Sequence, residues 1–140
     1  MDALTQRIKL HEGLNQSAYP DSLGYLTIGW GKLIDSRLGG KLSIAACDFI
    51  LAECIAESRA ELAGKSYYKY LDSVRADAIV ELCFAMGIEK LEKFVNMLDA
   101  LKVKDYIRAA NELRCSLWAS EVGPNRACDV AHRLEFGRYI

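Results

Sequence analysis

The sequence predicts an α+β protein in which a small antiparallel β-sheet lobe is followed by a larger helical lobe. Three observations support this fold class. Glycines and turn formers alternate with β-formers over residues 13–42, apolar residues recur at helical spacing from residue 43 onward, and no linker or repeat interrupts the chain. At 140 residues with 51% hydrophobic content, we expect one domain covering residues 1–140. Two lobes in one domain imply a cleft between them, a usual location for a binding site.

Charge and hydropathy exclude several classes of partner. The chain has 18 Lys and Arg residues against 19 Asp and Glu residues, a formal net charge of -1. General nucleic-acid binders and polybasic membrane ligands carry a large positive excess, so we expect no nucleic acid as partner. No apolar run approaches the length of a membrane span and the N-terminus has no secretory pattern, so we expect no stable membrane insertion.

The first element is a short helix over residues 4–12, which we assign to the helical lobe. Leu4 and Ile8 recur at helical spacing, and Gly13 is a typical helix stop. The sheet lobe follows over residues 13–42, because Pro20-Asp21, Gly24 and Gly29 separate residues such as Tyr19, Tyr25, Thr27 and Ile28.

The rest of the chain is predicted to be helical. An inter-lobe helix covers residues 43–64, and the helical lobe covers residues 66–140. Within that lobe, a central helix begins after the N-cap Asp72 and ends at Gly87. Further helices are expected over residues 94–101, 105–116 and 125–136.

Five cysteines stand at positions 47, 54, 83, 115 and 128. No pair has the CxxC spacing, so the sequence predicts no metal site. We expect the cysteines to be small buried hydrophobic residues in a reducing cytosol. A disulfide formed after release of the protein is the alternative.

Two carboxylates and a hydroxyl stand out in and beside the sheet lobe. Glu12 ends the first helix, Asp21 lies in a turn, and Thr27 lies on a strand. Cleavage of a glycosidic bond needs one carboxylic acid to protonate the leaving oxygen and a second carboxylate to assist water. From spacing alone, solvated carboxylates with Asp21 as a turn former are the alternative.

The order of these residues forms a longer motif: Glu12, eight residues, Asp21, five residues, Thr27, then Ile-Gly-x-Gly. Asp72-Ser73-Val74-Arg75 leads to Phe84-Ala85-Met86-Gly87, and Gly-Pro-Asn-Arg-Ala occupies residues 123–127. In this order and spacing, nearly the whole chain resembles the phage-type lysozymes, the family of the T-even phage endolysins. The resemblance implies a lysozyme-like two-lobed fold.

The same resemblance implies a muramidase that hydrolyses the β-1,4 bond between N-acetylmuramic acid and N-acetylglucosamine in peptidoglycan. Glu12 would be the general acid, and Asp21 and Thr27 would assist the attacking water in an inverting reaction. Arg126 would orient Glu12. No metal or organic cofactor is implied, since side chains can make both proton transfers.

Two further residues are expected to contact substrate: Leu33, which follows the sheet motif, and Phe94, which matches a cleft-side Phe of the family. The sequence departs from the family at Lys32, where T-even members have His, and at Ala85, where they have Gln. The stretch between the sheet and the helical lobe is also shorter than in those members.

In its cellular setting, the resemblance implies a monomeric endolysin made in the cytoplasm of an infected bacterium. A holin-type pore would release it to the periplasm and cell wall for host lysis. Two alternatives stay open: a lytic transglycosylase, which uses one acid and no water, and an inactive peptidoglycan-binding or phage structural module.

Overall fold

The computed structural model describes residues 3–20, 22–29, 32–33 and 41–140. The chain forms two compact units, Met1–Phe49 and Ile50–Ile140, called here the N-terminal unit and the helical unit. Each unit is described by itself. Helices predominate and the sheet is small, which confirms the predicted α+β class.

The N-terminal unit begins with α1, Ala3–Glu12. The helix ends because Gly13 adopts a left-handed backbone with φ of 70°, and its N–H donates a 3.0 Å hydrogen bond to the Lys9 carbonyl. A residue with a Cβ would be strained in this conformation, so glycine is favoured as the stop. Glu12 is thereby fixed as the last helical residue.

A three-stranded antiparallel sheet follows, in the order β1-β2-β3. Its strands are β1, Asn15–Pro20, β2, Leu26–Gly29, and β3, Lys32–Leu33. In the central strand, Thr27 pairs with Tyr19 on one side and with Leu33 on the other. This register places Thr27 at the middle of the sheet.

Helix α2, Ile44–Leu62, connects the two units in sequence. Ser43 directly precedes the helix, and its side-chain oxygen accepts a 3.1 Å hydrogen bond from the Ala46 N–H. Such N-capping stabilises a helix by about 1 kcal/mol. Ser58 and Leu62, near the end of the helix, are buried.

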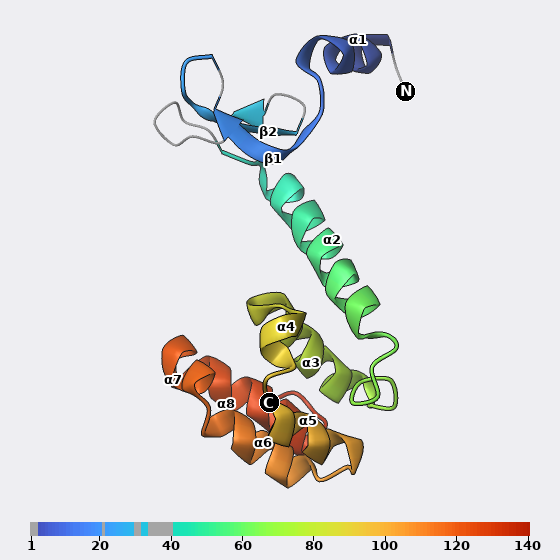
Figure 1. Cartoon of the computed structure of the whole chain (residues 1–140), viewed down its shortest axis with the longest axis vertical. Coiled ribbons are helices and arrows are strands. Elements are labelled where there is room, and N and C mark those ends of the chain that lie inside the picture. Colours follow the sequence, from blue (N-terminus) through green and yellow to red (C-terminus); the bar gives the residue numbers. More distant parts are fainter. Residues whose placement is uncertain (1–2, 21, 30–31, 34–40) are drawn as a thin grey trace. The chain divides into compact units, whose positions relative to one another are not determined.

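The helical unit contains six further helices, which Figure 1 shows in colours from green to red. Three of them begin in the same way, because the side chains of Asp72, Asp105 and Ser116 each accept a hydrogen bond from the backbone N–H three residues later. The helices are α3, Ser73–Met86; α4, Ile88–Leu91; α5, Val95–Lys102; α6, Tyr106–Arg114; α7, Leu117–Val122; and α8, Pro124–Phe136.

The core of this unit forms where α3, α5, α6 and α8 pack together. Ile79 and Leu82 of α3, Leu113 of α6 and Leu134 of α8 are fully buried. Burying one such side chain stabilises the fold by about 1.5–3 kcal/mol. Part of the apolar surface of the predicted central helix thus becomes core, whereas its Phe84 is 45% exposed.

Arg75 joins the beginning of α3 to the end of α8. Its Nε and Nη2 donate 2.7 Å hydrogen bonds to the carbonyls of Leu134 and Glu135, and its guanidinium lies 3.6 Å from the centre of the Tyr106 ring. The last carbonyls of a helix lack intrahelical partners. Arg75 therefore caps α8 from a distant part of the sequence.

The helix predicted over residues 105–116 corresponds to α6, which is one residue shorter at its start and two residues shorter at its end. A separate helix, α7, starts at Leu117 and was not predicted. The break occurs because the Ser116 Oγ accepts a hydrogen bond from the Ala119 N–H and so caps a new helix. The short helix α4 was also not predicted.

The prediction of buried cysteines is wrong for three of the five. All are free thiols; Cys83 is buried and Cys54 is half-buried, whereas Cys47, Cys115 and Cys128 are exposed. Apolar residues at helical spacing indicate one face of a helix, but not every residue on that face is buried in the core.

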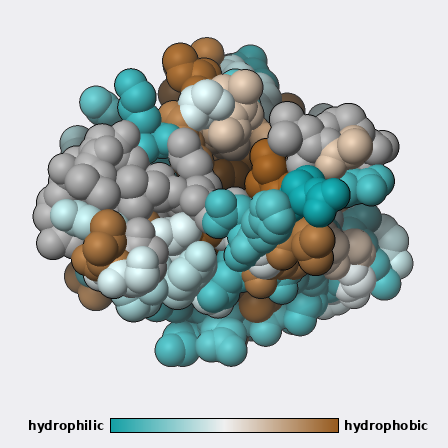
Figure 2. Space-filling view, turned by 90° about the horizontal axis from the view of Figure 1, so that it is seen from above, coloured by the Kyte–Doolittle hydropathy of each residue, from teal (hydrophilic) through white to brown (hydrophobic). Residues whose placement is uncertain are grey.

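Among the described residues, no helix is long and apolar enough to cross a membrane. Large apolar side chains nevertheless reach the surface of the N-terminal unit. On the face of the protein drawn in Figure 2, brown hydrophobic surface lies beside teal hydrophilic surface. The exposed apolar side chains of the N-terminal unit include Ile8, Leu10, Leu14, Leu23 and Leu26.

Candidate functional site

Glu12 lies at the junction between α1 and the sheet. It is the last residue of the helix, its side chain is exposed, and Gly13 turns the chain toward β1. A carboxyl group that is open to solvent can exchange its proton with water. The role of Glu12 as a general acid stays a prediction.

Thr27 lies in the central strand and is 5% exposed. Its hydroxyl donates a 3.2 Å hydrogen bond to the Tyr25 carbonyl. A threonine hydroxyl has one hydrogen to donate and two lone pairs that accept. Because the hydrogen is engaged by Tyr25, a further partner of this hydroxyl would have to donate a hydrogen bond to its oxygen.

Two predicted site residues are less fully described. Asp21 lies outside the described residues; it follows Pro20, which pairs with Leu26 across the β1–β2 hairpin. The backbone of Leu33 pairs with Thr27, but its side chain lies outside the described part. The predicted roles of Asp21 and Leu33 therefore stay predictions.

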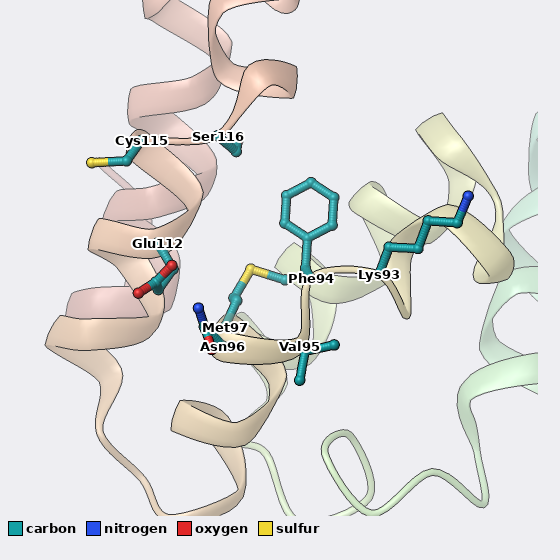
Figure 3. Close-up of a pocket in the computed structure, with 8 residues that line it drawn as sticks. All are labelled: Lys93, Phe94, Val95, Asn96, Met97, Glu112, Cys115 and Ser116. Atoms are coloured by element: carbon teal, nitrogen blue, oxygen red, sulfur yellow. The ribbon is translucent and has the colours of Figure 1, made fainter.

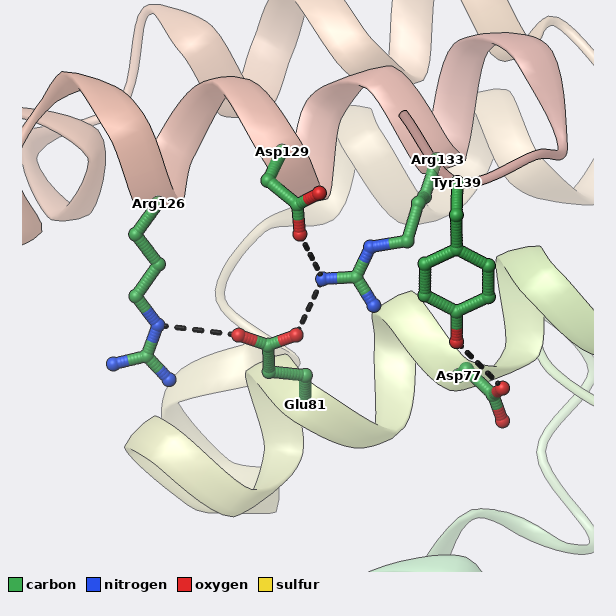
Figure 4. Close-up of polar contacts among 6 residues, drawn as sticks. All are labelled: Asp77, Glu81, Arg126, Asp129, Arg133 and Tyr139. Carbon is green, nitrogen blue, oxygen red and sulfur yellow. Dashed lines mark hydrogen bonds and ion pairs between the residues drawn. The ribbon is translucent and has the colours of Figure 1, made fainter.

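Arg126 lies in the first turn of α8, in the helical unit. Its Nε donates a 3.2 Å hydrogen bond to the Glu81 carboxylate of α3, and its guanidinium lies 5.9 Å from the Trp118 ring centre. Figure 4 shows Arg126 directed toward Glu81. The role that the resemblance gives Arg126, orienting Glu12, stays a prediction.

Glu81 binds a second arginine, Arg133. Through Nη2, Arg133 donates hydrogen bonds to Glu81 and, at 2.8 Å, to Asp129, and its side chain is only 5% exposed. Burial alone would lower the pKa of Arg133, but the two carboxylates outweigh burial and raise it. Arg133 is therefore a charged group held inside the unit by its carboxylate partners.

The contacts extend from Arg133 through Tyr139 to Asp77, because the Arg133 guanidinium lies 5.3 Å from the centre of the Tyr139 ring. Asp77 accepts 3.0 Å hydrogen bonds from the Arg59 guanidinium and the Tyr139 hydroxyl, and the bond to Asp77 raises the pKa of Tyr139. We call the whole set the arginine–carboxylate network, drawn without Arg59 in Figure 4. It comprises Arg59, Asp77, Glu81, Arg126, Asp129, Arg133 and Tyr139, of which all but Asp129 line a hollow of about 370 Å³.

Sequence reasoning missed most of this network, although part of its pattern was visible. Asp77 and Glu81 are four residues apart and so share a face of α3. Arg126, Asp129 and Arg133, at three- and four-residue steps, likewise share a face of α8. Opposite charges on two such faces are a cue that the helices pack against each other there.

Phe94 lies at the start of α5 and is half-buried against the core. With Lys93, Asn96, Glu112 and other residues it lines a hollow of about 320 Å³, shown in Figure 3. The aromatic ring offers an apolar face of the kind that packs on sugar rings. Its contact with substrate stays a prediction.

The prediction of no metal site can be compared with the described part of the chain only. Among the described residues, no three His, Cys, Asp or Glu side chains gather where they could bind a metal ion.

Of the two departures from the family motif, Ala85 is exposed, and the side chain of Lys32 lies outside the described part.

Comparison with known proteins gives the family. The family model described as phage lysozyme matches residues 9–133. Two curated relatives from Dictyostelium discoideum, "Probable T4-type lysozyme 1" and "Probable T4-type lysozyme 2", are 27% and 25% identical over 164 aligned residues. Each alignment covers 98% of this chain and 96% of the relative.

These alignments are longer than the 140 residues of the chain, so parts of both relatives have no counterpart here. The match nevertheless runs through the sheet, α2 and the helical unit almost without omission at either end. The chain belongs to the phage lysozyme family.

Proposed function

We propose that the protein is a muramidase that hydrolyses the β-1,4 bond between N-acetylmuramic acid and N-acetylglucosamine in peptidoglycan. The observation that carries this proposal is the family match over residues 9–133, which contains Glu12, Asp21 and Thr27 at the motif spacing. The exposed carboxyl group of Glu12 and the acceptor lone pairs of Thr27 add chemical support.

In the proposed reaction, Glu12 donates its proton to the glycosidic oxygen as the bond to the anomeric carbon breaks. The departing sugar leaves as an alcohol, and positive charge develops on the ring that remains. Glu12 becomes a carboxylate, which solvent then reprotonates. This step needs a protonated carboxyl group with access to substrate, and the end of α1 provides that access.

Water completes the proposed reaction. A nucleophilic water must direct a lone pair at the anomeric carbon, so its hydrogens must bind acceptors. Asp21 would accept the transferred proton, and the Thr27 oxygen, whose own hydrogen is engaged by Tyr25, would accept the second hydrogen. Attack opposite the departing oxygen inverts the anomeric configuration.

Substrate contacts and cellular role are further parts of the proposal. Leu33 and Phe94 would pack against sugar rings, and Arg126 would orient Glu12. An endolysin released by a holin-type pore would use this activity for host lysis. The two named relatives come from a eukaryote, so the enzymatic proposal does not depend on the lytic setting.

The test is digestion of purified peptidoglycan sacculi by the protein and by Glu12→Gln. The unmutated protein is expected to release soluble fragments with new reducing ends, and Glu12→Gln is expected to lose at least about a hundredfold in rate, the usual contribution of a general acid. Glu53→Gln, which changes another exposed helical glutamate, is the matched control and should retain full activity.

Product analysis separates the alternatives. Mass spectrometry that finds 1,6-anhydro ends instead of reducing ends would replace hydrolysis with a lytic transglycosylase reaction. No digestion by a folded protein that still binds sacculi would indicate an inactive peptidoglycan-binding module.

Thr27→Val should slow hydrolysis strongly, whereas Thr27→Ser keeps the acceptor oxygen and should retain much of the rate.

A further inference from the structure

A hollow of about 400 Å³ lies in the helical unit, between the segment that precedes α3 and the connection between α5 and α6. None of the predicted site residues lines it. Its lining includes three tyrosines, Tyr67, Tyr70 and Tyr106, and two lysines, Lys102 and Lys104. The lining side chains described there include no carboxylate, so the hollow combines aromatic surface with positive charge.

The tyrosines have different surroundings. Tyr70 is 77% exposed, unusual for a large aromatic side chain, whereas Tyr67 is buried and its hydroxyl donates a 3.2 Å hydrogen bond to Glu92. One face of the Tyr106 ring is covered by Arg75. Tyr70 is therefore the most exposed of the three tyrosines that line the hollow.

One ammonium group lies over this ring, and two other lysines line the same hollow. Lys102 and Lys104 are exposed, and Lys69 Nζ lies 5.0 Å from the centre of the Tyr70 ring. Lys102 has a carboxylate partner, Asp99, at 3.3 Å, but both side chains are about half exposed. Such a surface pair is weak, so Lys102 can exchange Asp99 for an anionic ligand.

Lys104 occupies a position that favours glycine. It has φ of 60°, and it is the one non-glycine residue with positive φ in the described part of the chain. Its N–H donates to the Leu101 carbonyl and the next N–H, of Asp105, donates to the Ala100 carbonyl, the pattern of a Schellman helix end. A lysine there is strained, whereas glycine would not be.

We propose that this hollow is an accessory binding site for anionic glycan, specifically a peptidoglycan strand that carries peptide carboxylates. A sugar ring has apolar faces that pack on an aromatic ring such as Tyr70, and the carboxylates pair with Lys102 and Lys104. This inference rests on the proposed function for its choice of glycan. The site holds the polymer at a place separate from Glu12 in sequence and unit.

The local charge also bears on how a chain of net charge -1 binds an anionic wall. Arg126 and Arg133, the arginines of α8, are paired with Glu81 and Asp129. At the hollow, Lys102 has the half-exposed Asp99 as its partner, and the lining itself includes no carboxylate. The two lysines are therefore the charged groups that the lining offers to a ligand.

The experiment measures cosedimentation with insoluble sacculi in the cold, with Glu12→Gln as the parent protein so that the polymer stays intact. Tyr70→Ala and Lys104→Gly in this parent are expected to weaken binding about five- to tenfold, roughly the effect of losing one stacking or charged contact. Tyr70→Phe, which keeps the ring, should bind like the parent. Lys90→Ala removes an exposed lysine of α4 and is the matched charge control.

Lys104→Gly separates binding from folding. Because glycine relieves the left-handed backbone, this variant should melt at the same or a higher temperature than the parent while binding less polymer. Sacculi whose carboxyl groups have been amidated should lose the part of the affinity that depends on Lys104. In the background with Glu12, Tyr70→Ala should slow digestion of sacculi but leave cleavage of a short soluble glycan unchanged.

Equal binding of all variants would overturn the proposal, as would an equal loss in Lys90→Ala. The same Lys104-dependent affinity for anionic lipid vesicles or duplex DNA would also overturn the assignment to glycan. Failure of the proposed function shows itself separately, because the protein with Glu12 would then bind sacculi in a Tyr70-dependent way without digesting them.

Discussion

At the residue scale, Glu81 is the carboxylate on which two arginines depend. It accepts hydrogen bonds from Arg126, which is partly exposed, and from Arg133, whose side chain is almost fully buried. Removing the partner of a buried charge leaves the desolvation cost of that charge uncompensated. Glu81 is therefore expected to matter more for stability than its position near the surface suggests.

We expect Glu81→Gln to lower the free energy of unfolding by about 1.5–3 kcal/mol, the range for hydrogen bonds to charged groups. Asp129→Asn should cost less, about 0.5–1 kcal/mol, because Asp129 is 42% exposed and lies only four residues from Arg133 in the same helix. Urea denaturation of both variants gives the comparison. A larger loss in Asp129→Asn would contradict the assignment of Glu81 as the main partner.

At the element scale, Asp72 holds the beginning of α3. Its carboxylate accepts a 3.1 Å hydrogen bond from the Arg75 N–H and a 2.8 Å bond from the Arg75 guanidinium. Burial alone would raise the pKa of Asp72, but the hydrogen bonds and charge of Arg75 outweigh burial and lower it. A carboxyl group with a lowered pKa stabilises the folded state when it is ionised.

Asp72→Ala should lower the free energy of unfolding by about 1 kcal/mol at neutral pH, the usual value of an N-cap. The stabilisation by Asp72 is fully present above its unfolded pKa of about 4 and is lost as the pH falls through the lower folded value. The difference between the two proteins should therefore shrink below about pH 4. Denaturation midpoints measured from pH 7 to pH 2 test this, and a difference that stays constant would be contrary to it.

The end of α8 depends on Gly137 as much as on Arg75. Gly137 has φ of 64°, and a Cβ there would lie 2.6 Å from the Arg75 Nη1 and 3.0 Å from its Cζ. An alanine would therefore meet both a strained backbone and the guanidinium that caps the helix.

Gly137→Ala is expected to cost more than the 1–2 kcal/mol that the backbone alone accounts for. In the Arg75→Ala background the clash is absent, so the cost of Gly137→Ala should fall to that backbone value. A double-mutant cycle measured by chemical denaturation gives the coupling. No coupling would mean that Arg75 moves aside without loss.

At the scale of the whole molecule, thiol accessibility reports on the packing of every part. Cys47, Cys115 and Cys128 are exposed, while Cys83 is buried and burial raises its pKa. Thiolate is the reactive form, so both access and charge protect Cys83.

In the native protein, an alkylating reagent should modify Cys47, Cys115 and Cys128 within the first minutes and leave Cys83 unmodified until the protein unfolds. Peptide mass spectrometry after timed labelling gives the order. Rapid modification of Cys83 together with the other three would show that the helical core opens readily.

Local chemistry explains which parts of the fold could be predicted. Gly13, Asp72 and Gly87 each define a helix end through their own backbone or side chain, so their effect is visible in the sequence. Thr27 was identified through the motif, and the structure adds its hydrogen bond to Tyr25. Ser116 was assigned to the end of one helix, although serine is also a common N-cap, and in the structure it caps the next helix, α7.

Contacts between distant segments account for what could not be predicted. The partners of Arg133 include Glu81, 52 residues away in sequence, and the hollow at Tyr70 joins two connections that are separated by α3, α4 and α5. Periodicity assigns residues to a face of one helix but does not say which faces meet. The same limit applies to the exposure of Cys115 and Cys128.

The hydrogen bonds from Arg75 to the end of α8 have a consequence for protein synthesis. The carbonyls that Arg75 binds lie 59 and 60 residues later in the sequence. At about 5–20 residues per second, a ribosome takes roughly 3–12 seconds to make that interval. During that time α3 exists without the helix it packs against, so the nascent chain exposes Ile79 and Leu82. Exposed apolar surface of this kind favours aggregation, so the apolar face of α3 is expected to need protection while the protein is being synthesised.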